Sequence, residues 1–200
     1  MNAWLAGDTV AEARRNHAVS HDHTQQELMA RYWAPIDTPG AVDEHGFLHE
    51  EGSWGGRASA ASLRTLADLR AEACMVLLGE SGAGKSFELE REEKWQRAQG
   101  GLVQSLRFSS LGRGGLPFDR MLEGTDADLW RRGDVVFSLF LDGIDEAVET
   151  PERIADILSG LLRTERGDLK KLRLRITGRF ATWSESMRRD LGSVCPSGTE

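Results

Sequence analysis

The sequence predicts an α/β protein built on a parallel sheet with helices on both faces. The first observation is that short apolar segments alternate along the chain with segments whose apolar residues recur every three or four positions. The second is that residues 135–141 form the strongest strand pattern of the chain, apolar except for Ser138. Strands that alternate with helices imply a parallel sheet that is buried on both faces.

The elements of the first half are predicted from apolar spacing and from glycines. In residues 59–73, leucines recur at three-residue intervals among Ala and Arg, which is typical of a short amphipathic helix. Residues 75–78 are an apolar run that stops at a glycine, and they predict a buried strand. A second helix is expected from about residue 84 to residue 99, where a pair of glycines ends it.

The second half continues the same alternation. Thr150 and Pro151 predict the start of a helix, because threonine caps helix N-termini and proline fits the first helical position. Apolar residues follow them at helical spacing as far as Leu162. The segments predicted in this half are strands at 102–108, 135–141 and 172–177, and helices at 151–162 and 183–191.

Composition places the chain among globular proteins of one domain with a short appendage. It has 200 residues, of which 28% are charged and 40% are apolar. Residues 1–58 are polar, carry all five histidines and predict a mostly irregular N-terminal extension, and residues 59–200 predict the folded core. Acids outnumber bases by 32 to 25, and this net charge of −7 argues against direct nucleic-acid binding.

The sequence also predicts a cytoplasmic protein. Its longest apolar stretch, residues 135–141, is far shorter than the ~20 residues of a membrane helix, and the N-terminus lacks the features of a secretory signal. Two cysteines provide no disulfide framework. His17, His21 and His23 have a spacing that allows a metal site, but the lack of accompanying ligands favours a solvated polar tail.

The segment between the first strand and the second helix matches the phosphate-binding pattern G-x-x-x-x-G-K-[ST]. It reads Gly79, Glu80, Ser81, Gly82, Ala83, Gly84, Lys85 and Ser86. Glycines allow the backbone to curl around an anion, so that successive N–H groups and the helix N-terminus point at phosphates. The motif therefore predicts a nucleotide site, with Lys85 on the β- and γ-phosphates and the Ser86 hydroxyl on Mg²⁺.

A second candidate site lies where the strand at 135–141 ends. Asp142 follows this strand directly, at the sheet edge where ligands of open α/β sheets bind, and is the expected Mg²⁺ partner. Asp145 and Glu146 are candidates to orient and deprotonate an attacking water. Alone, an acidic strand end is more often a solvated turn. Beside a phosphate-binding loop, the catalytic interpretation is favoured.

The interval between Lys85 and Asp142 leaves room for a helix, one further strand and its crossover. It predicts that a strand is inserted between the strands that precede Gly79 and Asp142. If residues 172–177 form that strand, Thr177 and Arg179 emerge beside the γ-phosphate, and Arg179 senses it through bidentate hydrogen bonds. An ordinary surface arginine is the competing interpretation.

Together these motifs predict a P-loop NTPase core, a three-layer α/β/α sandwich of the inserted-strand (ASCE) type that binds ATP and Mg²⁺. A P-loop kinase for a small molecule and a nucleotide-binding scaffold without turnover remain alternatives. The neighbouring acids Asp145 and Glu146 favour water activation and hence ATP hydrolysis over transfer to an acceptor. A GTPase is disfavoured because the sequence contains no Asn-Lys-x-Asp motif for guanine.

The phosphate loop, the Leu-Asp-Gly-Ile-Asp-Glu strand end and the later Ile-Thr-Gly-Arg segment resemble the NACHT-type STAND NTPases. These signal-transducing ATPases include animal innate-immune receptors and bacterial anti-phage proteins. The resemblance covers Met75 to about Leu191. It implies a nucleotide-dependent switch, self-assembly or an effector or sensor protein as partner, and γ-phosphate sensing by Arg179.

Family members continue after the fourth strand into a fifth strand, a helical lid and further domains, whereas this sequence stops at Glu200. The resemblance therefore predicts a core that is incomplete at its C-terminus, either as a fragment or as a natural short form. Without the lid residues that close over adenine, it implies weak nucleotide binding or slow turnover. It also predicts an exposed edge on the strand before Gly79, open to pairing with another chain.

Overall fold

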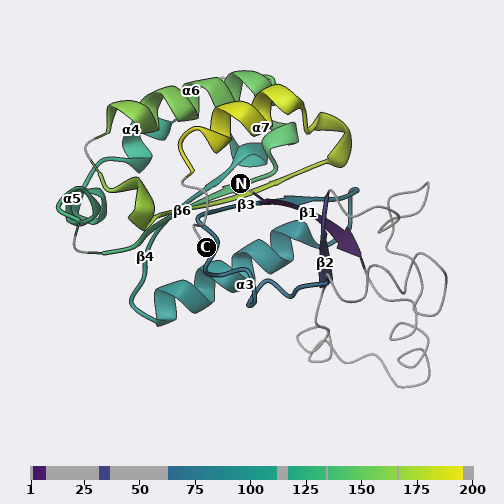
Figure 1. Ribbon diagram of the computed structural model, residues 1–200, viewed down its shortest axis with the longest axis horizontal. Helices are drawn as coiled ribbons and strands as arrows, with labels where there is room; N and C mark the ends of the chain where they lie inside the picture. Colours follow the sequence, from purple (N-terminus) through teal and green to yellow (C-terminus); the bar gives the residue numbers. More distant parts are fainter. Residues whose placement is uncertain are drawn as a thin grey trace.

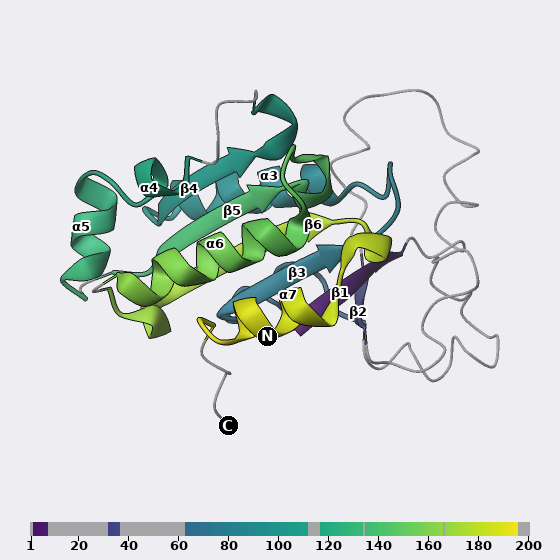
Figure 2. The ribbon, with the colours of Figure 1, turned by 90° about the horizontal axis from the view of Figure 1, so that it is seen from above.

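The computed structural model describes residues 2–7, 32–36, 63–111, 117–133, 135–165 and 167–195. Its centre is a six-stranded sheet with the order β2-β1-β3-β6-β5-β4, which Figure 2 shows side by side. The strands are β1 Asn2–Gly7, β2 Tyr32–Pro35, β3 Cys74–Leu78, β4 Leu102–Arg107, β5 Phe137–Asp142 and β6 Leu172–Gly178. Every neighbouring pair is parallel except β1 and β2, which are antiparallel, so the predicted α/β class with a parallel sheet is confirmed.

Helices lie on both faces of the sheet, with α3 on one face and α6 and α7 on the other (Figure 1). The helices are α3 Lys85–Ala98, α4 Phe118–Met121, α5 Thr125–Arg131, α6 Pro151–Thr164 and α7 Glu185–Gly192. Single 3₁₀ turns are formed by Phe108–Ser110, Ile144–Glu146, Leu169–Lys171 and Phe180–Thr182. Within the described ranges, no helix is both long enough and apolar enough to cross a membrane.

The main hydrophobic core lies between the sheet and the α6 and α7 face. Alternate residues of the strands point to this side and pack against the apolar stripe of α6. The members that form its centre, all 1% exposed or less, are Val76, Leu78, Leu139, Leu141, Leu174, Ile176, Ile154, Leu158 and Leu162. Cys74 and Cys195 are both buried free thiols at the margin of the same cluster.

The opposite face of the sheet is more polar. Here α3 buries Glu88 and Glu92 beside Leu89, and β6 contributes the fully buried Arg175. Glu92 is paired with Arg70 at 2.8 Å, and an Arg175 amino group donates to the carbonyl of Arg70 at 2.9 Å. Ion pairs and hydrogen bonds, as well as apolar contacts, therefore hold the helix that follows the glycine-rich loop.

The predicted position of the inserted strand is confirmed. Strand β6 pairs with β3 on one side and with β5 on the other, although both precede it in sequence. The carboxyl ends of these three strands consequently lie side by side at one edge of the sheet. This strand order brings the segments after residues 78, 142 and 178 together.

The predicted helix over residues 59–73 is wrong within residues 63–73, the part that the structure describes. Arg64 forms an antiparallel bridge with Trp33, with both N–H groups donating at 2.8 and 2.9 Å. A bridge requires extended backbone, so a helix cannot pass through this position. Turns follow in which each backbone N–H donates to the carbonyl three residues earlier. The Asp68 carboxylate accepts hydrogen bonds from the backbone N–H and the hydroxyl of Thr65. The apolar spacing still has a role, because it buries Leu66 and Leu69.

The expected exposed edge on β3 is also wrong. Strand β1 pairs with β3 in parallel, Asn2 opposite Met75 through Leu5 opposite Leu78, and β2 adds a further strand outside it. Both strands come from the region that was predicted to be mostly irregular. The boundary at residues 58 and 59 stays a prediction, but the sheet itself crosses it.

Candidate functional site

The candidate site lies at the carboxyl ends of β3, β6 and β5, where the chain leaves the sheet toward α3 and two 3₁₀ turns. Because three parallel strands end together, the loop of residues 79–84 faces Asp142 and the segment after Gly178. Open parallel sheets bind ligands at this edge. Close approach requires glycine at the end of β6, where a Cβ on Gly178 would lie 2.9 Å from the Ile144 side chain.

The 79–84 loop is folded around its own lysine. Gly82 and Gly84 have φ values of +83° and +76°, a left-handed conformation that glycine adopts without strain. The Lys85 ammonium donates to the carbonyls of Gly79 at 2.7 Å and Glu80 at 2.9 Å. The loop leads into the N-terminus of α3, whose N-cap residue Gly84 provides no side-chain cap, and helix N-termini after glycine-rich loops suit anions.

Asp142 is the centre of the polar network. Its Oδ1 accepts hydrogen bonds from the Ser86 hydroxyl at 2.8 Å and the Thr177 hydroxyl at 2.7 Å. The Thr177 hydroxyl in turn accepts the Gly143 N–H at 2.8 Å. The other carboxylate oxygen, Oδ2, lies 3.2 Å from Arg107 Nε. Three strand ends and the first turn of α3 thus meet at one carboxylate that is 8% exposed.

The two predicted catalytic acids have different surroundings. Asp145 accepts the backbone N–H of Arg179 at 3.1 Å and forms an ion pair with its guanidinium at 2.9 Å. Glu146 lies exposed in the same 3₁₀ turn, and within the described part of the chain no ion pair engages it. Asp145 therefore positions Arg179, and Glu146 is the acid open to a water.

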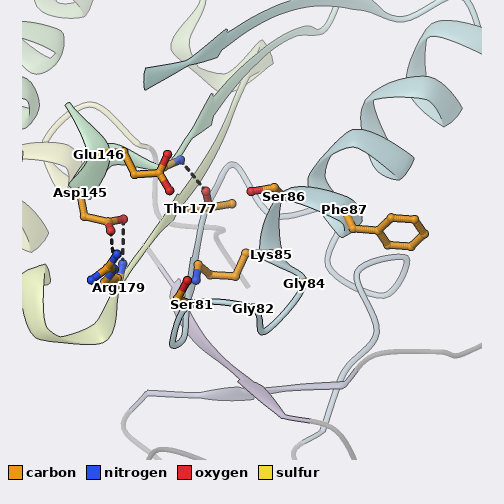
Figure 3. A pocket seen from close by; sticks show the side chains of 11 residues that line it. Ser81, Gly82, Gly84, Lys85, Ser86, Phe87, Asp145, Glu146, Thr177 and Arg179 are labelled. Carbon is orange, nitrogen blue, oxygen red and sulfur yellow. Dashed lines mark hydrogen bonds and ion pairs between the residues drawn. The ribbon is translucent and has the colours of Figure 1, made fainter. Parts of the chain in front are cut away.

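These groups line a cavity of about 220 Å³, shown in Figure 3. The Ser86 hydroxyl points toward Thr177, whereas Phe87 turns away from the other labelled side chains. The lining residues are Ser81, Gly82, Gly84, Lys85, Ser86, Phe87, Gly143, Asp145, Glu146, Thr177 and Arg179. Most of the predicted site is therefore brought together.

The remaining predicted residues lie beside the cavity and do not line it. Gly79 and Glu80 contribute the carbonyls that hold Lys85, Ala83 packs against an apolar cluster around Trp33, and Asp142 lies behind Ser86 and Thr177. The three histidines singled out in the sequence lie outside the described residues.

Burial lowers the pKa of the Lys85 ammonium below its ordinary value, and the carboxylates of Asp145 and Glu80 act in the opposite direction. A phosphate placed at the loop would add further negative charge and raise this pKa. The site thus holds a partly desolvated cation whose charged form an anionic ligand would stabilise.

The donor set suits Mg²⁺. Ser86 and Asp142 provide a hydroxyl and a carboxylate oxygen 2.8 Å apart, and hard cations prefer such oxygen ligands. Among the described residues there is no group of three or more His, Cys, Asp or Glu side chains that could hold a metal by themselves. A cation here would need further ligands from water or phosphate, which is the usual coordination of Mg²⁺.

Arg107 is the site residue that the sequence interpretation missed. It is the last residue of β4 and pairs in register with Asp142, the last residue of β5. The available signal was the alignment of strand ends in a parallel sheet, because the residue that ends the adjacent strand lies beside Asp142.

No protein-family model matches this chain, and neither the curated proteins nor the solved structures contain a significant match.

Proposed function

We propose that the chain binds Mg²⁺ and ATP at the 79–86 segment and acts as a nucleotide-dependent switch that hydrolyses ATP slowly. The observation that carries the proposal is the meeting of Lys85, Ser86 and Asp142 at the edge of one cavity, with Ser86 Oγ 2.8 Å from the carboxylate. Phosphate-binding loops use a lysine and a hydroxyl in these places, and a strand-end aspartate completes the metal site.

The same proposal includes the finer fold class and the family. A P-loop NTPase core of the inserted-strand type, a three-layer α/β/α sandwich, has a strand between the loop strand and the aspartate strand, as β6 lies here. The sequence resemblance to NACHT-type STAND NTPases adds the role in signalling. Function in bacterial anti-phage defence, a cytoplasmic location and self-assembly or an effector or sensor partner rest on the resemblance and composition alone.

In this proposal, residues of the 79–84 loop and of the first turn of α3 bind the phosphates of ATP. Lys85 exchanges the carbonyls of Gly79 and Glu80 for phosphate oxygens, since both are acceptors for the same ammonium. Ser86 and Asp142 hold Mg²⁺, which supplies charge neutralisation of the phosphates when bound. Thr177 keeps Asp142 oriented through its 2.7 Å hydrogen bond.

In this proposal, the residues that promote hydrolysis lie in the turn after β5 and in the segment after β6. Glu146 accepts a proton from a water whose oxygen attacks the γ-phosphorus, and ADP leaves as the terminal P–O bond breaks. Arg179 stabilises the charge on the γ-phosphate and is positioned by Asp145 through the 2.9 Å ion pair. Asp145 and Arg179 therefore act as one unit.

The test is a thermal-shift titration with Mg·ATP, Mg·GTP and ATP with chelator. Saturation at 100 times the dissociation constant adds about 2.7 kcal/mol, which raises the midpoint by roughly 5–10 °C at this size. Lys85→Ala should abolish the shift. Lys170→Ala is the matched control, because this exposed lysine precedes β6 at the opposite end of the strand. A cooperative unfolding transition whose midpoint is unchanged by every nucleotide would refute the proposal.

A second candidate function is phosphoryl transfer to a small molecule. It is favoured by a second cavity of about 320 Å³, which shares Ser86 with the first, is lined by Asp142 and provides room for an acceptor. Phosphate release without any acceptor, reduced roughly 100-fold in Glu146→Gln with ATP binding retained, supports hydrolysis. Nucleotide binding without release, followed by transfer when acceptors are added, supports a kinase. Binding with neither reaction indicates a scaffold.

A further inference from the structure

Arg107 occupies the free side of the carboxylate to which we assign Mg²⁺. It ends β4 and lies in register with Asp142, and its Nε is 3.2 Å from Asp142 Oδ2. The other oxygen, Oδ1, already accepts the hydroxyls of Ser86 and Thr177. Among the described residues, the Arg107 guanidinium is thus the cation that forms an ion pair with Oδ2.

Mg²⁺ and Arg107 cannot both make full use of this carboxylate. A divalent cation between Ser86 and Asp142 would lie a few ångströms from a guanidinium that is permanently charged. Their repulsion opposes metal binding, whereas each of them alone is attracted to Asp142. A bound Mg²⁺ and Arg107 would therefore compete for one buried carboxylate.

Arg107 has a second position within reach. Its terminal amino group lies 3.9 Å from Glu90 Oε2 on α3, and its side chain is 55% exposed. Both residues line the second cavity, about 320 Å³ in volume, so the side chain has room to leave Asp142 without displacing the core. Glu90 is itself 48% exposed and already bonded to Lys94 at 2.8 Å, which makes it a weak and reversible partner.

We propose that Arg107 is an internal counter-ion that gates the metal site. It neutralises Asp142 when no metal is bound and moves to Glu90 when Mg²⁺ enters, so that it lowers metal affinity. This inference rests on the proposed function, since it concerns the same metal site. If Arg107 instead contacted the γ-phosphate and activated the site, its removal would weaken ligand binding, which is the opposite of the effect expected for a gate.

The direct test is the affinity for Mn²⁺ alone, measured by electron paramagnetic resonance without nucleotide, in wild type and Arg107→Gln. Removal of one unit charge at about 5 Å from a divalent ion in a solvated site should tighten Mn²⁺ binding about tenfold. Arg97→Gln is the matched control, because Arg97 is similarly exposed, pairs with Glu93 on α3 and has the same charge. It should change the affinity far less.

For a second variant, Glu90→Gln, the proposal predicts the opposite change in Mn²⁺ affinity. Glu90→Gln removes the destination of Arg107, so Mn²⁺ should bind more weakly than in wild type, and the effect should shrink when Arg107→Gln is present as well. Unfolding midpoints without ligand confirm that each variant folds. Unchanged or weaker Mn²⁺ binding in Arg107→Gln overturns the gate, and so does the absence of Mn²⁺ binding in both proteins.

The two proposals fail in distinguishable ways. If Arg107→Gln tightens Mn²⁺ binding but no nucleotide shifts the wild-type midpoint, the gate stands and ATP binding is lost as a function. If Mg·ATP stabilises the protein through Lys85 but Mn²⁺ affinity is equal in all variants, ATP binding stands and the gate is refuted.

Discussion

At the scale of single residues, Thr177 connects the proposed metal site to the backbone. It is fully buried, its hydroxyl donates to Asp142 Oδ1 at 2.7 Å, and it accepts the Gly143 N–H at 2.8 Å. One hydroxyl therefore satisfies a buried donor and orients the carboxylate that follows β5. A side chain of the same shape without a hydroxyl would leave the Gly143 N–H without its acceptor and would remove one of the hydrogen bonds to Asp142.

Thr177→Val should destabilise the protein by about 1–3 kcal/mol, because the buried Gly143 N–H loses its acceptor. It should also weaken the Mg²⁺-dependent part of ATP binding, since Asp142 loses one of the hydrogen bonds that orient it. Thr177→Ser retains the hydroxyl and is the control. Chemical denaturation gives the first quantity and calorimetric titration with and without Mg²⁺ the second; a variant as stable as wild type would refute this role.

At the scale of elements, the two long helices are held to the sheet in different ways. On α6 an apolar stripe that includes Ile154, Leu158 and Leu162 faces the main core. On α3 the buried positions include Glu88 and Glu92, which are held by ion pairs with neighbouring arginines. The helix that begins at the candidate phosphate site is thus the more polar of the two.

The start of α6 is set by its cap. Thr150 has extended backbone, its hydroxyl accepts the Arg153 N–H at 3.3 Å, and Pro151 takes the first helical position, as the sequence predicts. Thr150→Ala should lower the free energy of unfolding by about 1 kcal/mol, and Thr150→Ser should restore most of it. The measurement is the urea midpoint at constant slope. Equal midpoints for alanine and serine would show that the cap contributes nothing.

At the scale of the whole molecule, the N-terminal strand completes the sheet. Strand β1 lies between β2 and β3 and pairs with both, so the strand that carries the glycine-rich loop is an interior strand. An interior position protects the β3 edge from pairing with another chain. The integrity of the candidate site therefore depends on residues remote from it in sequence.

Leu5→Pro tests this arrangement. Proline removes a ladder N–H from a strand that has neighbours on both sides, opposite Leu78 and Ala34. We expect a loss of about 2–3 kcal/mol, a midpoint lower by roughly 5–10 °C, and concentration-dependent association through the uncovered edge. Leu5→Val keeps the N–H and is the control. Light scattering and thermal unfolding provide the readouts, and a variant that melts like wild type would rule out a structural role for β1.

Local patterns were sufficient for much of this molecule. The apolar runs that became β3, β5 and β6, the cap of α6 and the loop motif of residues 79–86 are each encoded within a few residues. The place of β6 between β3 and β5 agrees with the strand insertion that was predicted, although the strand within the interval between Lys85 and Asp142 is β4, at the edge of the sheet. The cavity then assembles Lys85, Ser86 and Arg179 from these elements.

Other features were decided only by tertiary structure. Strand β1 was not predicted because pairing with β3 is a contact between distant segments, and Arg64 was assigned to a helix because its bridge to Trp33 is equally non-local. Arg107 became a site residue through strand register alone. Periodicity and capping determine what a segment forms by itself, but the choice of its neighbour depends on which edges and charges the folded chain leaves unpaired.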